Sequence, residues 1–487
     1  MAFFISPWFH TYIRTVQKHR FLGLLGGPIG FTLILTFGFG LEEQQSKMLA
    51  IAVWMIIWWV LEVFPIYITA MIPMVLFPTL GIMPLKDTFA PYASPIVFLF
   101  FGGFLIALAL EKHHVHKRIA YGLLRLTGTK PANVILGTML ATALIAMWIS
   151  NTATAVMMLP IGISITRLVS ASGLTEKESS RFSILLMLTI AFSANIGGIM
   201  TLIGTPPNLV FAAYQLEFTG TEISFASWLG YGVPLGITLL AGAYLTMVKV
   251  LFPVGSKPIH GLAGMLEEKW KALGSPSLAE RLVIAVFGIT VFGWIFLSQI
   301  NELIGEKVLS NTTVAMAGGL LMFMVPEQLS KGKFLLHWKD TKNLPWGIII
   351  LFGGGLALAA GLDQVGLIDL IAKVIVSQSP SNGIMLIIPL VLLSIFLTEI
   401  MSNVALVTVL LPVVFGIAEQ LEVPVLALAL PVTFAASCAF MMPISTPPNA
   451  IVYSSGLLRV DQMVKAGFWL NVIATLFISL FGWLLLV

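Results

Sequence analysis

Long apolar stretches separated by short polar loops run through the whole chain. A helix of about 20 apolar residues crosses a bilayer, and the uninterrupted stretches come close to that length. They lie near residues 21–40, 48–64, 65–81, 94–112, 228–248, 281–300, 310–326, 346–376 and 464–487. The pattern predicts an all-α polytopic membrane protein.

Four further apolar segments are interrupted by glycine, proline, serine and asparagine. We interpret residues 131–168 and 383–419 as re-entrant hairpins, and residues 182–215 and 425–457 as spanning helices broken at a Thr-Pro-Pro-Asn motif. The hairpin tips are expected at Ser150-Asn151 and at Ser402-Asn403. With the uninterrupted stretches, this gives about eleven spans and two hairpins.

Three short motifs occur twice, in the same order and about 250 residues apart. Phe-Gly-Gly precedes each hairpin, Ser-Asn stands at each tip, and Thr-Pro-Pro-Asn follows each hairpin. The copies are Phe101-Gly102-Gly103 and Phe352-Gly353-Gly354, Ser150-Asn151 and Ser402-Asn403, and Thr205-Pro206-Pro207-Asn208 and Thr446-Pro447-Pro448-Asn449. Ordered recurrence at a nearly constant offset indicates an internal repeat.

The composition excludes an ordinary soluble protein. The chain is 58% hydrophobic and 10% charged, whereas a soluble domain is about 25% charged. Its single cysteine, Cys438, excludes an intramolecular disulfide and a cysteine metal cluster.

Basic residues indicate the orientation of the chain. With a cytoplasmic N-terminus, the 26 lysines and arginines fall inside or at the edge of the inside segments, except for Lys47, Lys86, Lys307 and Lys373. Those segments are 1–20, 112–130, 167–181, 249–281, 327–346 and 458–465. Under the positive-inside rule this places the C-terminus outside and the two halves in opposite orientations, as in many secondary transporters.

Each interruption ends one half-helix and begins another. An ending helix presents bare carbonyl oxygens, which suit a cation, and a beginning helix presents bare amides, which suit an anion. Helix starts are expected at Asn151-Thr152, Asn403-Val404, Pro206-Pro207 and Pro447-Pro448, because asparagine is a good N-cap and proline suits the first turn. A single Ser-Asn-Thr in a membrane helix usually forms hydrogen bonds to a neighbouring helix, and a single Pro-Pro usually kinks the helix that contains it. Because both motifs occur twice and in the same order, we favour one site at the membrane midplane that binds anions and cations together.

Other polar residues give weaker signals. His113, His114 and His116 stand beside basic residues at a predicted cytoplasmic end, so we expect a solvated positive flank there. The acidic residues in or beside apolar segments are functional hypotheses by default, and they are Glu62, Asp363, Asp369 and Glu399. Glu399 has the best position, three residues before Ser402. The sequence has no serine–histidine–acid set, paired-carboxylate site or zinc motif, so we expect no enzyme, no organic cofactor and no nucleic-acid partner.

The paired hairpin tips and Thr-Pro-Pro-Asn breaks resemble those of the divalent anion/sodium symporter family, which includes sodium-coupled dicarboxylate, citrate and sulfate carriers. The resemblance covers essentially the whole chain. It implies a homodimer of an integral plasma (inner) membrane protein that works by an elevator movement. The implied transport domain comprises residues 131–227 and 383–463, the scaffold comprises 1–130 and 228–382, and 464–487 form the last helix.

The same resemblance implies roles for individual residues. Ser150, Asn151 and Gly204 would contribute to one sodium site, and Thr398, Asn403 and Ser445 to a second. The implied carboxylate pocket is lined by Asn151, Thr152, Thr205, Asn403, Val404, Thr446 and Pro447. Two positions depart from some relatives: Val404 replaces a threonine, and Ala146 offers only its carbonyl.

Charge balance favours coupling to cations. Lys373 is the only basic residue well inside a predicted membrane segment, and it is far from the motifs. Helix N-termini supply only about half a charge each, so bound cations are the remaining source of positive charge. At ~6 Å and an effective dielectric near 20, one sodium–carboxylate pair contributes roughly 3 kcal/mol.

We therefore expect sodium-coupled symport of C4-dicarboxylates such as succinate. The alternatives are sodium-independent exchange of dicarboxylates, or sodium-coupled transport of citrate or sulfate. A channel or a receptor is disfavoured by the inverted repeat and by the absence of a soluble signalling domain from the sequence.

Overall fold

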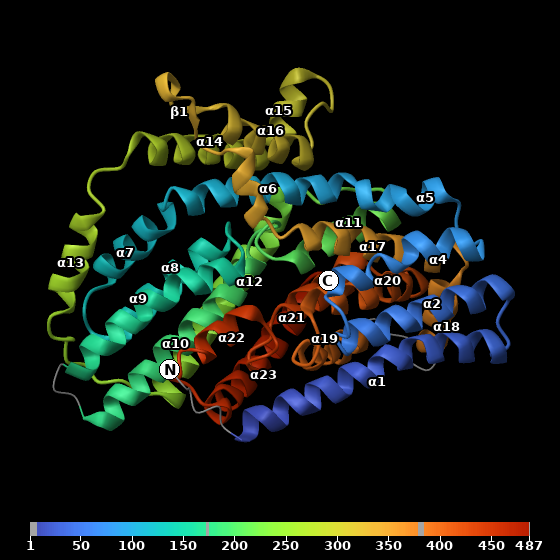
Figure 1. Ribbon diagram of the computed structural model, residues 1–487, viewed down its shortest axis with the longest axis horizontal. Coiled ribbons are helices and arrows are strands. Elements are labelled where there is room, and N and C mark those ends of the chain that lie inside the picture. Colours follow the sequence, from blue (N-terminus) through green and yellow to red (C-terminus); the bar gives the residue numbers. More distant parts are fainter. Residues whose placement is uncertain (1–6, 172–174, 378–383, 487) are drawn as a thin grey trace.

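The computed structural model describes residues 7–171, 175–377 and 384–486, and these are almost entirely helical (Figure 1). The strands within this part of the chain form one short hairpin, β1 (Pro326–Gln328) with β2 (Lys333–Phe334). The expected boundary between residues 382 and 383 and the first six residues of the predicted cytoplasmic N-terminus lie outside the described residues.

The N-terminal helices lead into the first repeat. Before it come α1 (Pro7–Phe37), α2 (Glu43–Val60), α3 (Ile66–Thr69), α4 (Ile72–Leu80), α5 (Leu85–Phe89) and the 3-10 turn η1 (Ala90–Ala93). The first repeat contains α6 (Pro95–Lys112), α7 (Val115–Thr127), α8 (Pro131–Ala146), α9 (Asn151–Ala171), α10 (Glu176–Ile199), α11 (Pro206–Thr219) and α12 (Phe225–Leu245).

The second repeat has the same succession of helices. The connection contains the π-turn η2 (Thr246–Leu251), α13 (Leu262–Ala272), α14 (Leu278–Ile295), α15 (Leu297–Ile304), α16 (Asn311–Met324) and the 3-10 turns η3 (Leu329–Lys331) and η4 (Trp338–Asn343). The second repeat contains α17 (Trp346–Gln364), α18 (Leu367–Ser377), α19 (Ile384–Leu397), α20 (Asn403–Gln420), α21 (Val425–Ala436), α22 (Pro447–Tyr453) and α23 (Val460–Leu484). The helical repeat predicted from the motifs is therefore present.

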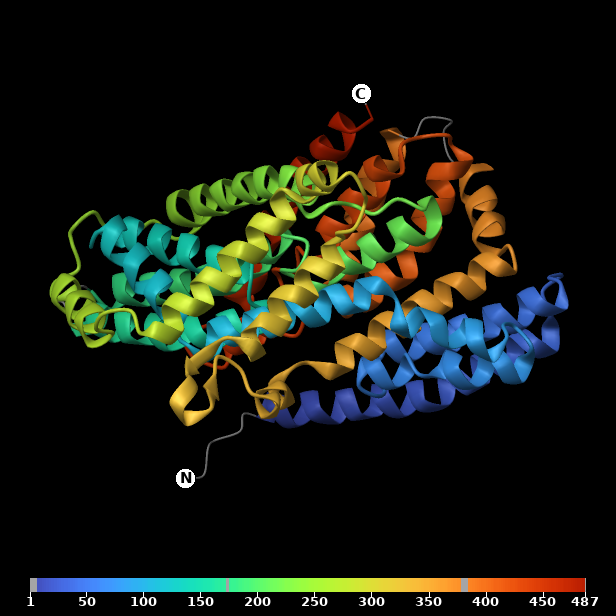
Figure 2. The same ribbon diagram turned by 90° about the horizontal axis from the view of Figure 1, so that it is seen from above.

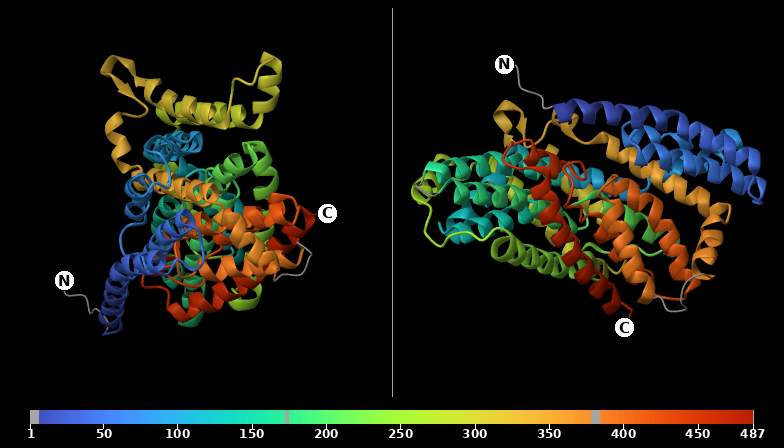
Figure 3. Two further views of the ribbon diagram at one scale, coloured as in Figure 1. Left: turned by 90° about the vertical axis from the view of Figure 1, so that its right-hand side faces the viewer. Right: turned by 90° about the horizontal axis from the view of Figure 1, so that it is seen from below.

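The helices form layers around a buried centre. Helix α1 lies along one edge of the molecule and α12 along the opposite edge (Figure 2, and Figure 3, right). Helices α14, α15 and α16 form an outer layer above α6, and α16 packs directly against α6 (Figure 1, and Figure 3, left). Helix α10 lies at the centre, because the most hydrophobic part of it is fully buried and it packs against α8, α9 and α22.

Local sequence explains where many of these helices begin. Thr175, Ser224, Ser277 and Ser310 stand at N-cap positions, and the side-chain oxygen of each accepts a backbone amide of the first turn. Such caps satisfy amides that the helix itself leaves free. The helices thus begin where polar loops meet apolar stretches.

The Phe-Gly-Gly motifs allow close packing of helices. A Cβ on Gly102 would lie 2.5 Å from the Ala315 carbonyl carbon in α16, and one on Gly354 would lie 2.2 Å from the Ala70 carbonyl oxygen. Real Cβ atoms do not approach backbone so closely. Glycine therefore lets α6 and α17 touch their neighbours backbone to backbone.

Eight helices in the described part of the chain are long and apolar enough to cross a membrane, and six apolar helices are shorter. The expected continuous helix over 346–376 is wrong, because Gly366 adopts φ +71° between α17 and α18. The expected helix over 65–81 is also divided, into α3 and α4, and Pro73 stands in the first turn of α4. Local backbone geometry thus divides apolar stretches that look continuous in the sequence.

The predicted solvated histidine flank is wrong for His116. Its side chain is buried at the start of α7. Burial, together with the neighbouring charges of His114 and Lys117, lowers the pKa of His116 to about 4. His116 is therefore neutral at pH 7 and adds no positive charge.

Candidate functional site

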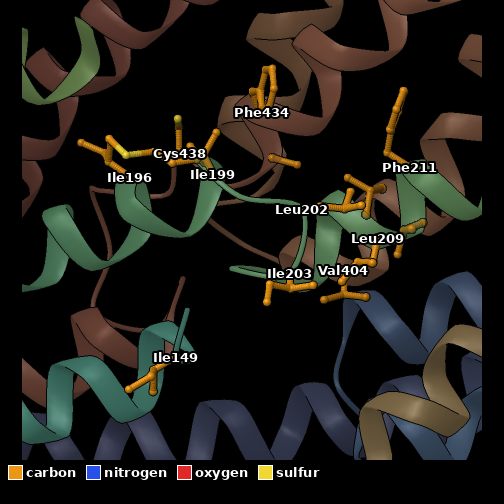
Figure 4. Packing of buried hydrophobic residues seen from close by; sticks show 14 of the residues in the cluster. Ile149, Ile196, Ile199, Leu202, Ile203, Leu209, Phe211, Val404, Phe434 and Cys438 are labelled. Atoms are coloured by element: carbon orange, nitrogen blue, oxygen red, sulfur yellow. The ribbon is translucent and has the colours of Figure 1, made fainter. Parts of the chain in front are cut away.

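Four breaks in the helices bring the repeated motifs together. The two hairpin breaks lie between α8 and α9 and between α19 and α20, and the two Thr-Pro-Pro-Asn breaks lie between α10 and α11 and between α21 and α22. Helix α9 contacts α22, and α11 contacts α20, so each hairpin packs against the broken helix of the other repeat. Buried apolar side chains of both repeats surround the breaks, among them Ile203, Val404 and Cys438 (Figure 4).

One cavity of about 670 Å³ lies where these breaks meet. Both hairpin tips and both Thr-Pro-Pro motifs line it, and so does a loop between α2 and α3. The lining residues are Glu62–Tyr67, Ser150, Asn151, Thr152, Asn195, Thr205, Pro206, Pro207, Ile348, Leu351, Ser402, Asn403, Val404, Ile444, Ser445, Thr446, Pro447, Pro448 and Ala450. Helices α9, α11, α20 and α22 all begin at this cavity.

The structure brings most of the residues chosen from the sequence to the cavity. Ser150 and Ser445 line it, as do all seven of the expected substrate-binding residues. Gly204 and Thr398 are not lining residues. Thr398 is fully buried, and a Cβ on Gly204 would lie 2.6 Å from the Gly198 carbonyl oxygen. These two residues lie behind the cavity surface.

An asparagine side chain holds each Thr-Pro-Pro-Asn break. In the first repeat, Asn208 Nδ2 donates to the carbonyls of Gly198 (2.9 Å) and Thr201 (2.7 Å). In the second, Asn449 Nδ2 donates to the carbonyls of Ala439 (3.1 Å) and Met442 (3.0 Å). The four acceptors occupy matching positions in the two repeats. The amide thus satisfies carbonyls that the interrupted helix leaves bare.

One contact links the repeats directly. Asn195, in α10, donates through Nδ2 to the Ala439 carbonyl (3.2 Å) and to Thr446 Oγ1 (3.1 Å). Asn195 is buried in α10 and also lines the cavity. It ties the first broken helix to the second Thr-Pro-Pro motif.

Several buried oxygens at these breaks have no hydrogen-bond donor among the described residues. They are Oδ1 of Asn151, Asn208 and Asn449. Thr398 Oγ1 lies 2.7 Å from Asn403 Oδ1 and 2.6 Å from the Ala436 carbonyl. A hydroxyl has one hydrogen and can donate to only one of these two oxygens. Such oxygen-rich breaks fit the carbonyl-based sodium sites of transporters with broken helices.

The cavity contains little charge. Glu62 is the one charged side chain among the described residues that line it, and no lysine, arginine or histidine does so. Nor do the described residues include a group of three or more histidine, cysteine, aspartate or glutamate side chains that could hold a metal ion. The site therefore offers hydroxyls, amides and helix ends.

Residues 28–487 match the family described as the sodium:sulfate symporter transmembrane region. The chain belongs to this family. The sodium-dependent dicarboxylate transporter SdcS of Staphylococcus saprophyticus is 36% identical to it over 476 residues, which cover 96% of this chain and 91% of that protein. The SdcS protein of Staphylococcus aureus (strain USA300) is 35% identical over 494 residues, covering 98% and 94%.

A solved structure shares the fold. The YdaH transporter of Alcanivorax borkumensis aligns with a TM-score of 0.55 at 12% identity, covering 82% of this chain and 86% of that one. At this identity the likeness concerns the fold alone. Membership of the sodium:sulfate symporter family confirms the resemblance that the paired motifs indicate, and the chain is an integral multi-pass membrane protein.

Sequence reasoning missed part of this symporter-family cavity. Residues 63–67, in the α2–α3 loop and the start of α3, and the α17 residues Ile348 and Leu351 line it but belong to none of the repeated motifs. Glu62, chosen from the sequence as an acidic residue beside an apolar segment, also lines it. Glu62 has an unusual left-handed backbone (φ +44°). Asn195 gave a usable signal, because it is an isolated amide in a long apolar helix, ten residues before Thr205.

Proposed function

We propose that this member of the family is a sodium-coupled symporter of C4-dicarboxylates such as succinate. The observation that carries the proposal is a cavity lined by the paired motifs of both repeats, with unpartnered oxygens at the breaks and no basic side chain among the described lining residues. A dianion in such a cavity needs cations for charge balance, because helix starts supply only partial charges. The names and high coverage of the SdcS relatives support sodium and dicarboxylate as the transported ions.

The roles of individual residues form part of the proposal. Sodium would bind at one site made by Ser150, Asn151 and Gly204 and at a second made by Thr398, Asn403 and Ser445. The dicarboxylate would contact the seven cavity residues that the sequence analysis names. The oxygens around Thr398 and the free Oδ1 of Asn151 support this division.

We further propose that the motion is an elevator movement within a homodimer in the plasma (inner) membrane. Residues 131–227 and 383–463 would move against the remaining helices. The α2–α3 loop supports this division, because Glu62 lines the cavity from outside both moving segments.

We also propose that the N-terminus is cytoplasmic and the C-terminus lies outside, and cysteines placed at Lys177 and at Glu419 test this orientation. Labelling of both from the same side would contradict the inverted orientation.

Uptake into proteoliposomes tests the function. We expect an inward sodium gradient to drive succinate uptake, and choline in place of sodium to abolish it. Undiminished uptake in choline, with strong stimulation by internal dicarboxylate, would establish exchange instead. Competition by unlabelled citrate and sulfate would identify the preferred anion, and sulfate is included because of the family's description.

A further inference from the structure

The buried carboxylate of Glu399 plays no part in the function proposed above. Glu399 lies in the break between α19 and α20 and is 4% exposed. Oε1 accepts the backbone amides of Phe440 (2.8 Å) and Met441 (2.9 Å), and Oε2 accepts that of Met442 (3.1 Å). Two side chains complete the shell: Ser445 Oγ donates to Oε2 (2.6 Å) and Asn471 Nδ2 donates to Oε1 (2.9 Å).

Four of these neighbours, the three backbone amides and the Asn471 amide, can only donate. The fifth, the Ser445 hydroxyl, lies within hydrogen-bond distance of Oε2 (2.6 Å) and of the Glu399 backbone carbonyl (3.0 Å). An ionised carboxylate is purely an acceptor and can take all five hydrogen bonds, whereas a protonated one has a single acceptor within reach, the Ser445 hydroxyl. The hydrogen bonds are therefore complementary to the charged form, and hydrogen bonds to a charged acceptor are strong. No lysine or arginine is among the groups that bond to this carboxylate within the described chain.

The three backbone amides belong to residues that would form the next turn of α21 if that helix continued. In an α-helix each amide bonds to the carbonyl four residues earlier, so Phe440, Met441 and Met442 would bond to the carbonyls of residues 436–438. Helix α21 instead ends at Ala436, and Glu399 accepts the three amides. The Ala436 carbonyl thereby becomes available and faces the Thr398 hydroxyl at 2.6 Å.

The carboxylate also orients Ser445. Both acceptors within reach of the Ser445 hydroxyl belong to Glu399: Oε2 at 2.6 Å and the backbone carbonyl at 3.0 Å. Because a hydroxyl has a single hydrogen, a bond to either one leaves the oxygen's lone pairs for another partner. Ser445 and Thr398 belong to the proposed second sodium site. Glu399 is bonded to the first of these residues and adjoins the second in sequence.

The first repeat lacks the three features of this arrangement. Met147 stands at the position that corresponds to Glu399, and Gly204 at the position that corresponds to Ser445. Helix α10 continues to Ile199, about one turn beyond the residue equivalent to the end of α21. A carboxylate, a hydroxyl and an unwound turn thus occur together in one repeat and are all missing from the other.

We propose that Glu399 is a positioning residue for the second cation site. As a buried anion it takes the place of three helix carbonyls, keeps residues 437–445 unwound and turns oxygens of Ala436, Thr398 and Ser445 toward a sodium ion. Its charge strengthens sodium binding at this site relative to the first. The proposal rests on the sodium coupling proposed above.

The test compares sodium titrations of succinate uptake in proteoliposomes containing the full chain. Glu399→Gln keeps the shape but removes the charge and places an NH₂ group against amide donors. We expect the sodium concentration for half-maximal uptake to rise about tenfold or more, equivalent to ~1.4 kcal/mol, with uptake partly restored at high sodium. Glu302→Gln, on the exposed helix α15, is the matched control and should titrate like the parent protein.

A second variant keeps the test decisive if Glu399→Gln does not fold. Ser445→Ala retains the carboxylate and its three backbone bonds, and we expect a smaller rise in the sodium requirement, about threefold, with a melting temperature close to that of the parent. An unchanged sodium requirement in either folded variant would overturn the proposal, even if its melting temperature falls, because a purely structural role predicts that result. Sodium-independent uptake by the parent protein would instead overturn the symport function.

Discussion

The two repeats use the same chain positions to join hairpin to broken helix, but different atoms. In the first repeat, the Thr201 hydroxyl donates to the Met147 carbonyl. At the corresponding positions of the second repeat, the Met442 amide donates to the Glu399 carboxylate. The first joint uses neutral groups and the second uses a buried charge. A shared backbone framework thus supports two chemically different sites.

What the repeats keep in common is equally informative. Asn208 and Asn449 hold matching carbonyls and each leaves Oδ1 without a donor among the described residues. A bare carbonyl buried without a partner costs free energy, so the asparagine amide stabilises each Thr-Pro-Pro-Asn break. The common parts therefore maintain the breaks, and the differing parts distinguish the two sites.

Removing the amide at either hairpin tip should have the largest effect. We expect Asn151→Ala and Asn403→Ala each to reduce succinate uptake at least ~100-fold, or about 2.7 kcal/mol, because each loses an oxygen at the cavity. Uptake by purified, reconstituted protein measures this. Asn301→Ala, which alters an amide bound to Leu309 away from the cavity, is the control. Near-normal uptake by one variant would show that only one repeat carries the site.

Exchanging Gly204 and Ser445 should show how differently the two breaks are packed. A side chain on Gly204 meets the fixed Gly198 carbonyl, so Gly204→Ser should cost at least ~2 kcal/mol of stability through overpacking. Ser445→Gly should cost about 1 kcal/mol, since it loses the hydrogen bond to Glu399. Thermal unfolding in detergent measures both. Equal losses would mean that the two breaks are packed alike.

The sequence predicts the elements that recur and misses those that do not. Four breaks and both tips could be located because each polar motif interrupts an apolar stretch twice, in register. Leu351 and Tyr67 belong to no motif, and only the folded chain brings them to the cavity. The division of 346–376 at Gly366 does not show in the hydropathy of the stretch, because hydropathy does not report a left-handed residue. The three backbone amides that Glu399 accepts were equally out of reach, since backbone amides carry no sequence signal.

The smallest expected effect comes from placing the same residue type at positions 152 and 404 of the two hairpin tips. Thr152 and Val404 occupy corresponding positions, and both line the cavity. Threonine and valine have nearly the same shape, so Val404→Thr replaces one methyl group by a hydroxyl of similar size. If that hydroxyl reaches a substrate carboxylate, it should contribute about 1 kcal/mol, and the apparent KM for succinate should fall about fivefold at saturating sodium.

The reciprocal variant, Thr152→Val, should raise the KM by a similar factor and leave the sodium requirement unchanged. Succinate titrations at fixed, saturating sodium measure both, and the double variant should restore a value near that of the parent. A change in the sodium requirement without a change in KM would instead place residues 152 and 404 beside the cations. The two tips would then differ in how they hold sodium, and the cavity wall that contacts the dianion would lie mainly on the Thr-Pro-Pro side.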